Sequence, residues 1–276
     1  MSGLARRYRL LLVDLDGVVW RGRRVLRENV EWLRRARLAG ARIVYVTNNS
    51  TRSRRVYAER LSAIMGYRVA PEDVVTSGYA VARLLSEKAG SVRVVVVGEE
   101  GLVEELVAAG HVVLPVGDGA RCPVDYVVVG LDRGLTYSKL KTAHLAITRC
   151  GARLAASNTD TTIPVEEGSL PGAGSILAAL ETSTGVRAEL VAGKPEPYMY
   201  RLAMEMAGVG PGEALAIGDR CDTDIEAAKR AGIDSVLVLT GVAGERGDRC
   251  DATYTVRTLA ELDGILGDAE ATHRES

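Results

Sequence analysis

Short apolar runs alternate with segments of helical periodicity along the whole chain. Arg9–Val13 and Arg42–Val46 are predicted to be buried strands, and Glu28–Ala39 and Arg52–Met65 are the helices expected after them. A glycine follows each of these helices, and glycine commonly ends a helix. Strands that alternate with helices in this way predict an α/β fold with a doubly wound parallel sheet.

The same alternation continues toward the C-terminus. Further predicted strands are Val92–Val97, Tyr126–Val129, Ala214–Ile217 and Ser235–Leu239. Further predicted helices are Glu99–Ala109, Thr136–Cys150, Gly174–Thr182, Pro197–Ala207 and Asp222–Ala231. A chain of 276 residues is long for a single core, so one large domain or two smaller ones are expected.

Two carboxylates follow the first predicted strand, in the segment LLVDLDGVVW. Asp14 and Asp16 stand at the carboxyl end of that strand, where open α/β sheets bind their ligands. Residues two apart in an extended chain share a face, so the two groups are expected at one site. Carboxylates this close repel unless a cation or proton neutralises them, and hard oxygen ligands favour Mg²⁺. The alternative is that Asp16-Gly17 forms an ordinary turn.

Two further places in the sequence carry polar side chains that could bind phosphate. One directly follows the second predicted strand, and the other lies in the segment around Lys194. Thr47 and Asn48 offer donors at the start of a helix, which suits phosphate oxygens or a simple helix cap. Lys194 lies between Gly193 and Pro195, so its ammonium could neutralise phosphate and carboxylate charge or belong to a surface turn.

The segment ALAIGDRCDTD places another carboxylate, Asp219, at the end of a predicted buried strand. Asp219 is the better metal-ligand candidate because of this position. Asp224 is expected to support the ligands from outside or through water. Acidic residues in a first helical turn are also ordinary complements of the helix dipole.

The halves of this candidate site flank a long stretch that has its own predicted strands and helices. A discontinuous domain carrying an insertion explains this better than one oversized sheet. The predicted core comprises residues 1–79 and 181–276, and the predicted inserted domain comprises residues 80–180.

These segments together, in this order, resemble the four-motif signature of the haloacid dehalogenase (HAD) superfamily: DxDG, a threonine after the second strand, an isolated lysine and a later GDxxxxD. TNNSTRS, VVVGLDRGLTYSKL, NTDTTIPVEEGSLPGAGS and GKPEPYMY further resemble its NagD-like, p-nitrophenylphosphatase branch. The resemblance covers nearly the whole chain. It implies a Rossmann-like core with an inserted α/β cap of type C2.

The resemblance also implies a mechanism. Asp14 would attack phosphorus and form an aspartyl-phosphate, and Asp16 would protonate the departing alcohol and then activate water. Mg²⁺ would be bound by Asp14, the backbone carbonyl of Asp16, and Asp219. The transferring phosphoryl oxygens would be held by Thr47, the backbone at Asn48, and Lys194.

The resemblance places a polar cap loop over the active site: Asn158, Thr159, Asp160, Thr161 and Thr162. Vertebrate pyridoxal-phosphate phosphatases of this branch carry DPWHP where this chain has DTTIP. The missing aromatic and imidazole groups argue against pyridoxal phosphate and favour a small phosphorylated acid or sugar. The alternative is that these residues only shape a turn.

We therefore expect a Mg²⁺-dependent phosphomonoester hydrolase that acts on a small phosphorylated metabolite. p-Nitrophenyl phosphate would be an artificial substrate, and phosphoglycolate, a sugar phosphate or a nucleotide are candidates. The alternatives are a phosphotransferase or mutase of the same superfamily, and a non-catalytic protein that binds phosphorylated ligands. A nicotinamide-dependent enzyme is disfavoured, because the dinucleotide fingerprint is missing.

Charge and cysteine content bear on partners and location. The net charge of −1 gives no electrostatic footprint for nucleic acid or anionic membrane. The four widely spaced cysteines form no metal pattern, so a cytoplasmic protein with free thiols is expected, with disulfide pairing left open. The resemblance suggests a homodimer through the cap, where Val127 and Val129 could belong to the sheet core or to an interface.

Overall fold

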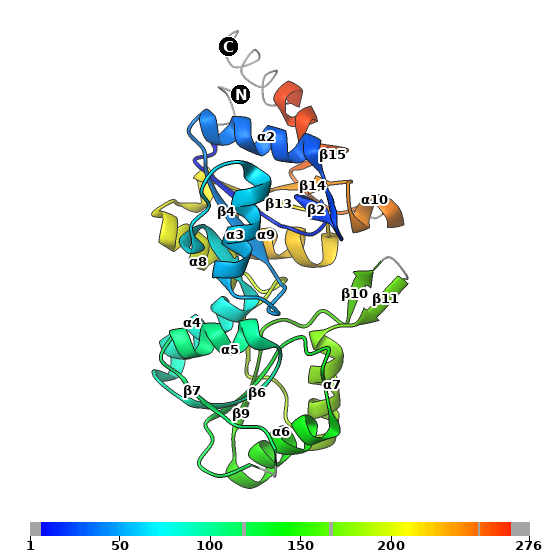
Figure 1. Cartoon of the computed structure of the whole chain (residues 1–276). Coiled ribbons are helices and arrows are strands. Elements are labelled where there is room, and N and C mark those ends of the chain that lie inside the picture. The colour runs from blue at the N-terminus through cyan, green and yellow to red at the C-terminus, as the bar shows by residue number, and fades with distance from the viewer. Residues whose placement is uncertain (1–6, 118–119, 166–167, 248, 266–276) are drawn as a thin grey trace. The chain divides into compact units, whose positions relative to one another are not determined.

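The computed structural model describes residues 7–117, 120–165, 168–247 and 249–265, and the chain forms two compact units. Unit 1 contains Met1–Thr47, Ala58–Val75 and Lys194–Ser276, and unit 2 contains Asn48–Tyr57 and Thr76–Gly193. Each unit has its own β-sheet and helices (Figure 1). The domain limits expected after residues 79 and 180 stay a prediction, since compactness alone does not establish independent folding.

Unit 1 contains a six-stranded sheet. Its order is β15–β14–β13–β1–β4–β5, and β1 pairs in parallel with both β4 and β13. β13–β14 and β14–β15 are parallel as well, so the expected α/β fold with a parallel sheet is confirmed. The strands are β1 (Leu10–Val13), β4 (Arg42–Thr47), β5 (Val74–Thr76), β13 (Ala214–Gly218), β14 (Asp234–Val238) and β15 (Tyr254–Val256).

Helices cover this sheet because its central strands are apolar on both faces. All four residues of β1 are buried, as expected for a strand inside a parallel sheet. α8 contacts β1 and β4, and α9 contacts β14. The remaining elements of unit 1 include a short antiparallel hairpin of β2 and β3. Their bounds are α2 (Arg27–Leu38), α8 (Tyr198–Ala207), α9 (Glu226–Ala231), α10 (Val242–Arg246), β2 (Trp20–Arg21) and β3 (Arg24–Val25). α3 (Arg54–Met65) belongs to unit 1 from Ala58 onward.

Unit 2 contains a five-stranded sheet of order β12–β9–β8–β6–β7, in which every pairing is parallel. A separate antiparallel hairpin of β10 and β11 extends from this unit (Figure 1). The strands are β6 (Arg93–Val97), β7 (Val112–Leu114), β8 (Tyr126–Val129), β9 (Arg153–Ala156), β10 (Thr162–Val165), β11 (Gly168–Pro171) and β12 (Leu190–Val191).

The core of unit 2 follows the alternation of side chains along its strands. Val127 and Val129 are fully buried and pack, with alternate valines of β6, against α6 and α7. Both therefore belong to the sheet core. Thr136 caps the start of α6 (Tyr137–Cys150), because its hydroxyl accepts from the Lys139 N–H, and Gly151 follows the helix in a left-handed conformation. The helices are α4 (Ser77–Ala89), α5 (Glu100–Ala108), α6 (Tyr137–Cys150) and α7 (Ala173–Thr184).

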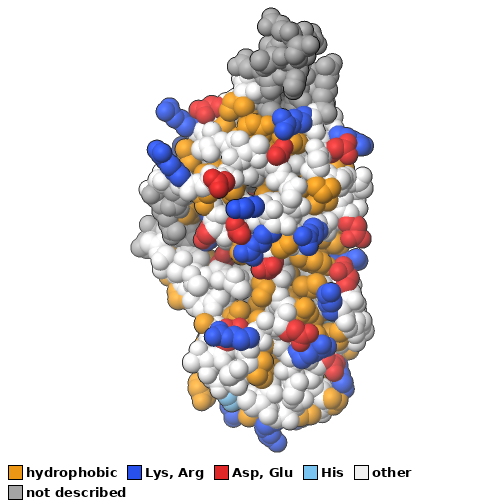
Figure 2. Space-filling model, turned by 180° about the vertical axis from the view of Figure 1, so that it is seen from behind, with side chains coloured by type: hydrophobic (Ala, Val, Ile, Leu, Met, Phe, Trp, Pro, Cys, Tyr) orange, Lys and Arg blue, Asp and Glu red, His pale blue; other side chains and the backbone are white. Residues whose placement is uncertain are grey.

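The surface and the helices give two further observations. On the face shown in Figure 2, basic and acidic side chains are interspersed, and neither sign gathers in a single patch. Within the described ranges, no helix combines the length and apolarity needed to cross a membrane.

Replacing Leu12 by Ala tests the central position of β1. Leu12 has no exposed surface, so the change removes buried methyl groups and leaves a cavity; we expect a loss of about 3 kcal/mol in the free energy of unfolding. Denaturant titration measures this loss. Leu38→Ala is the control, because Leu38 is 88% exposed, and an equal loss in both variants would contradict the assignment.

Candidate active site

Asp14 lies directly after β1 and is almost completely buried. Gly17, three residues later, has φ of +82°, a backbone conformation that side chains strongly disfavour. A Cβ at Gly17 would lie 2.3 Å from Oδ2 of Asp219, so only glycine leaves room for that carboxylate. The absence of a side chain at Gly17 therefore lets the segments that carry Asp14 and Asp219 approach closely.

Asp219 follows β13, the strand that pairs with β1. Its Oδ2 atom accepts from the backbone N–H of Val242 at 2.7 Å. A Cβ at Gly241 would lie 2.0 Å from the same oxygen. Glycines on two sides and one backbone donor thus fix this buried carboxylate beside the end of β1.

Lys194 joins the carboxylates of the cluster. Its Nζ atom donates to Oδ1 of Asp14 and to Oδ1 of Asp224, each at 2.6 Å, and all three side chains are buried. Burial lowers the pKa of Lys194, but Asp14 and Asp224 outweigh this effect and hold the pKa well above its usual value. The lysine is therefore a charged member of the site and not a surface residue in a turn.

The carboxylates of this cluster fit a divalent cation. Asp14, Asp219 and Asp224 each offer one oxygen, and these oxygens lie within 4.8 Å of one another. Burial raises the pKa of Asp14 well above its usual range and, together with Asp224, raises that of Asp219 to about 7. Three carboxylates and one ammonium leave two negative charges when all are ionised, and oxygen ligands of this kind suit Mg²⁺.

Asp16 takes a different position from the other carboxylates. It has solvent contact, and its Oδ1 accepts from the indole Nε1 of Trp20 at 3.0 Å. The surrounding protein displaces water and raises the pKa of Asp16, an effect that the Trp20 hydrogen bond opposes. The metal contact expected from Asp16 involves its backbone carbonyl and stays a prediction.

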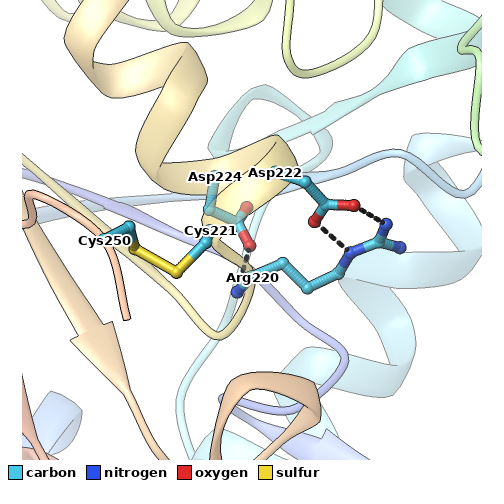
Figure 3. The surroundings of a disulfide bond; sticks show 5 residues. All are labelled: Arg220, Cys221, Asp222, Asp224 and Cys250. Atoms are coloured by element: carbon cyan, nitrogen blue, oxygen red, sulfur yellow. Dashed lines mark hydrogen bonds and ion pairs between the residues drawn. A yellow bond between two sulfur atoms is a disulfide. The ribbon is translucent and has the colours of Figure 1, made fainter. Parts of the chain in front are cut away.

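Asp224 is a larger part of the cluster than the sequence indicated. The segment Cys221–Ile225 is a π-helical turn, where the sequence predicted the start of an α-helix. A Cβ at Gly218 would lie 2.2 Å from the Asp224 carboxyl carbon, so this glycine admits the side chain. As Figure 3 shows, Asp224 also accepts from the backbone N–H of Arg220, whereas Asp222 pairs with the Arg220 guanidinium.

Three of the residues predicted to bind phosphate or substrate meet within unit 2. Asn48 donates to Oδ2 of Asp160 at 3.0 Å, and Asn158 donates to the backbone oxygen of Asn48 at 2.7 Å. The side chain of Thr161 is exposed, and its backbone oxygen accepts from the Gly172 N–H. In unit 1, Thr47 is the buried last residue of β4.

The four cysteines form two disulfides, Cys122–Cys150 and Cys221–Cys250, so the expectation of free thiols is wrong. Cys221 belongs to the turn that carries Asp224 (Figure 3). Cys221 and its partner Cys250 both pack against a small apolar cluster of Ile225, Leu237 and Ala243. Pairing across 29 residues depends on the folded chain, and cysteine spacing alone carries no signal for it.

Comparisons with known proteins place this site in a family context. Residues 11–112 match the family model of haloacid dehalogenase-like hydrolases, and residues 191–262 match a second, HAD-hydrolase-like model. A D-glycerol 3-phosphate phosphatase of Mycobacterium tuberculosis is 43% identical over 243 residues, which cover 88% of this chain and 66% of that longer protein. An acid sugar phosphatase of Staphylococcus aureus is 37% identical, with 93% and 97% of the two chains covered.

Solved structures give the same grouping. A p-nitrophenyl phosphatase from Archaeoglobus fulgidus has a TM-score of 0.83 at 32% identity and covers 93% of this chain and 98% of its own. A glycerol phosphate phosphatase from Mycobacterium tuberculosis, solved in complex with magnesium, has a TM-score of 0.82 at 39% identity. That match covers 94% of this chain and 77% of the other.

The raised pKa of Asp219 predicts pH-dependent metal binding. Mg²⁺ requires the carboxylate form, and a pKa of about 7 means that the proton is held as the pH falls below neutrality. We expect Mg²⁺ affinity, measured by calorimetry, to be roughly tenfold weaker at about pH 6 than at about pH 8, with proton release on binding. Equal affinities at the two pH values would contradict this.

The two disulfides predict a separable effect on stability and metal binding. They span nearly equal separations, 28 and 29 residues, so replacing either pair by Ala should cost about 3 kcal/mol of unfolding free energy. Only Cys221→Ala/Cys250→Ala should also weaken Mg²⁺ binding, because Cys221 lies in the turn of Asp224. Calorimetry on both double variants measures this, and equally weakened binding in both would refute the link.

Proposed function

We propose that this chain, which belongs to the haloacid dehalogenase-like hydrolases, is a Mg²⁺-dependent phosphatase that hydrolyses small phosphate monoesters through phosphorylated Asp14. The observation that carries the proposal is the buried Lys194, which donates to Asp14 and Asp224 beside Asp219. This cluster holds one carboxylate at the end of β1 and concentrates charge of both signs around it.

In the first step a carboxylate oxygen of Asp14 attacks phosphorus, so an oxygen–phosphorus bond forms as the ester bond to the leaving oxygen breaks. Asp16 gives its proton to that oxygen, and the alcohol departs. In the second step Asp16 takes a proton from water, whose oxygen attacks phosphorus and releases inorganic phosphate and free Asp14. The raised pKa of Asp16 supports its protonated form at the start of this cycle.

Lys194 orients Asp14 and supplies positive charge for the phosphoryl oxygens. Thr47 and the backbone at Asn48 are proposed as their further donors. Bound Mg²⁺, held by Asp14, Asp219 and the backbone carbonyl of Asp16, would screen the charge between nucleophile and phosphate. Asp224 would orient Lys194 and the backbone of Arg220, to which it is hydrogen-bonded.

Unit 2 is proposed as the cap, and we assign the choice of substrate to its polar cluster. Asn158 and Asp160 are held by hydrogen bonds to Asn48, whereas Thr161 is exposed. Amide, carboxylate and hydroxyl groups suit the hydroxyls of a small phosphorylated sugar, polyol or acid. The relatives named for glycerol 3-phosphate and acid sugars support this class.

Assembly and location are predictions of the same kind. A homodimer through unit 2 agrees with the resemblance described above, and light scattering tests it. The cytoplasmic location expected from the sequence remains a prediction; two disulfides are unusual in a reducing cytosol outside hyperthermophiles.

Asp14→Asn tests the proposed nucleophile. The amide cannot form the phosphorylated intermediate, so phosphate release from p-nitrophenyl phosphate should fall by at least about 1000-fold, with the fold retained. The wild-type rate should be lost on chelation with EDTA and restored by Mg²⁺. Added acceptor alcohols should leave inorganic phosphate as the main product. A phosphorylated alcohol as main product would indicate a phosphotransferase, and full activity of Asp14→Asn would refute the proposal.

A further inference from the structure

Trp20 holds one oxygen of Asp16. The indole Nε1 donates to Oδ1 of Asp16 at 3.0 Å, and the ring is almost completely buried. The backbone between them is also closed, because the Gly17 N–H donates to the Trp20 carbonyl at 2.7 Å and the Trp20 N–H to the Leu15 carbonyl at 3.2 Å. Asp16 therefore lies in a tight loop with one side-chain oxygen engaged.

Arg60 of α3 contacts the face of the Trp20 ring. Its guanidinium carbon lies 3.8 Å from the centroid of the indole ring, a cation–π contact. The same guanidinium donates to the backbone oxygen of Gly22, at 3.4 Å, in the turn between β2 and β3. The indole is thus fixed by the loop behind it and by the cation on its face.

An indole N–H can only donate, so the oxygen that it contacts must accept. In a protonated carboxyl group the carbonyl oxygen is a better acceptor than the hydroxyl oxygen, so this contact favours the form of Asp16 with its proton on Oδ2. We propose that Trp20, supported by Arg60, is a positioning residue that keeps Oδ1 of Asp16 occupied and presents Oδ2 to the leaving oxygen of the ester. The inference rests on the proposed function and adds the device that orients its acid.

If Asp16 is poorly oriented as the general acid, the rate falls most for esters whose leaving group is strongly basic. p-Nitrophenolate is a weak base and leaves with little help from a proton, whereas the phenolate of phenyl phosphate is a stronger base and needs protonation. The two esters have similar shapes, so binding differences are small. kcat/KM reports steps up to the transfer of the phosphoryl group to Asp14, where the leaving group departs.

Trp20→Phe removes the N–H and keeps an aromatic ring beneath Arg60. We expect kcat/KM for phenyl phosphate to fall roughly tenfold more than kcat/KM for p-nitrophenyl phosphate, part of the usual contribution of general acid catalysis. Arg60→Met, which removes the cation but leaves an apolar side chain, should change the ratio in the same direction by roughly threefold. This second variant keeps the test decisive if Trp20→Phe does not fold.

The chain contains a matched control. Trp32, the other tryptophan, is fully buried in α2, and its Nε1 also donates to an aspartate, Oδ1 of Asp263, at 3.0 Å. Trp32→Phe loses the same bond and the same volume, so it should leave the ratio of the two substrates unchanged. An unchanged ratio in both Trp20→Phe and Arg60→Met, or an equal change in Trp32→Phe, would overturn the inference. Failure of the wild-type protein to hydrolyse either ester would instead overturn the proposed function.

Discussion

The bridge that Lys194 makes between Asp14 and Asp224 is the interaction on which the site depends. Buried carboxylates are costly unless a charge or a hydrogen bond compensates for their lost hydration. One ammonium with two short contacts supplies that compensation for two of them, and Asp219 relies on a backbone N–H and on the space that glycines leave. The cluster is nevertheless short of positive charge, and this excess of negative charge suits a divalent cation.

The sheet of unit 1 brings together residues that are far apart in the chain. β1 and β13 are neighbours and run parallel, so Asp14 and Asp219 emerge at the same edge. Parallel pairing by itself sets backbones at a fixed spacing, and the close approach of side chains needs missing Cβ atoms at Gly17, Gly218 and Gly241. The strand order thus determines at which edge of the sheet the acidic residues lie. The glycines allow their side chains to approach one another closely there.

Much of this architecture is visible in the sequence, because strong local patterns produced it. Apolar runs such as LLLV and YVVV correspond to β1 and β8, and Thr136 and Gly151 bound α6. Several short strands, β5, β7, β9, β10, β11, β12 and β15, and the helix α4 were not predicted, since few residues carry each strand and α4 follows β5 directly. The family resemblance provided roles for Asp14 and Lys194 that residue chemistry alone left open.

Local sequence patterns did not predict the features that depend on long-range contacts or on unusual local geometry. The π-helical turn that brings Asp224 to Lys194 has no signal in GDRCDTD apart from Gly218. The contact of Trp20 with Asp16 depends on a closed loop, and the cysteine pairs depend on the packing of segments almost thirty residues apart. In each case the deciding contact is made by the folded chain.

The Cys221–Cys250 bond also changes what a broken chain would look like. It encloses α9, β14 and α10, so a protease that cut once between Asp224 and Cys250 would produce two pieces that remain one covalent molecule. The piece bearing Asp219 and Asp224 would stay attached to the piece bearing β15, and reassembly would need no encounter between separate fragments. The bond therefore makes the backbone in that span partly redundant for keeping β15 in the same molecule as the acidic cluster.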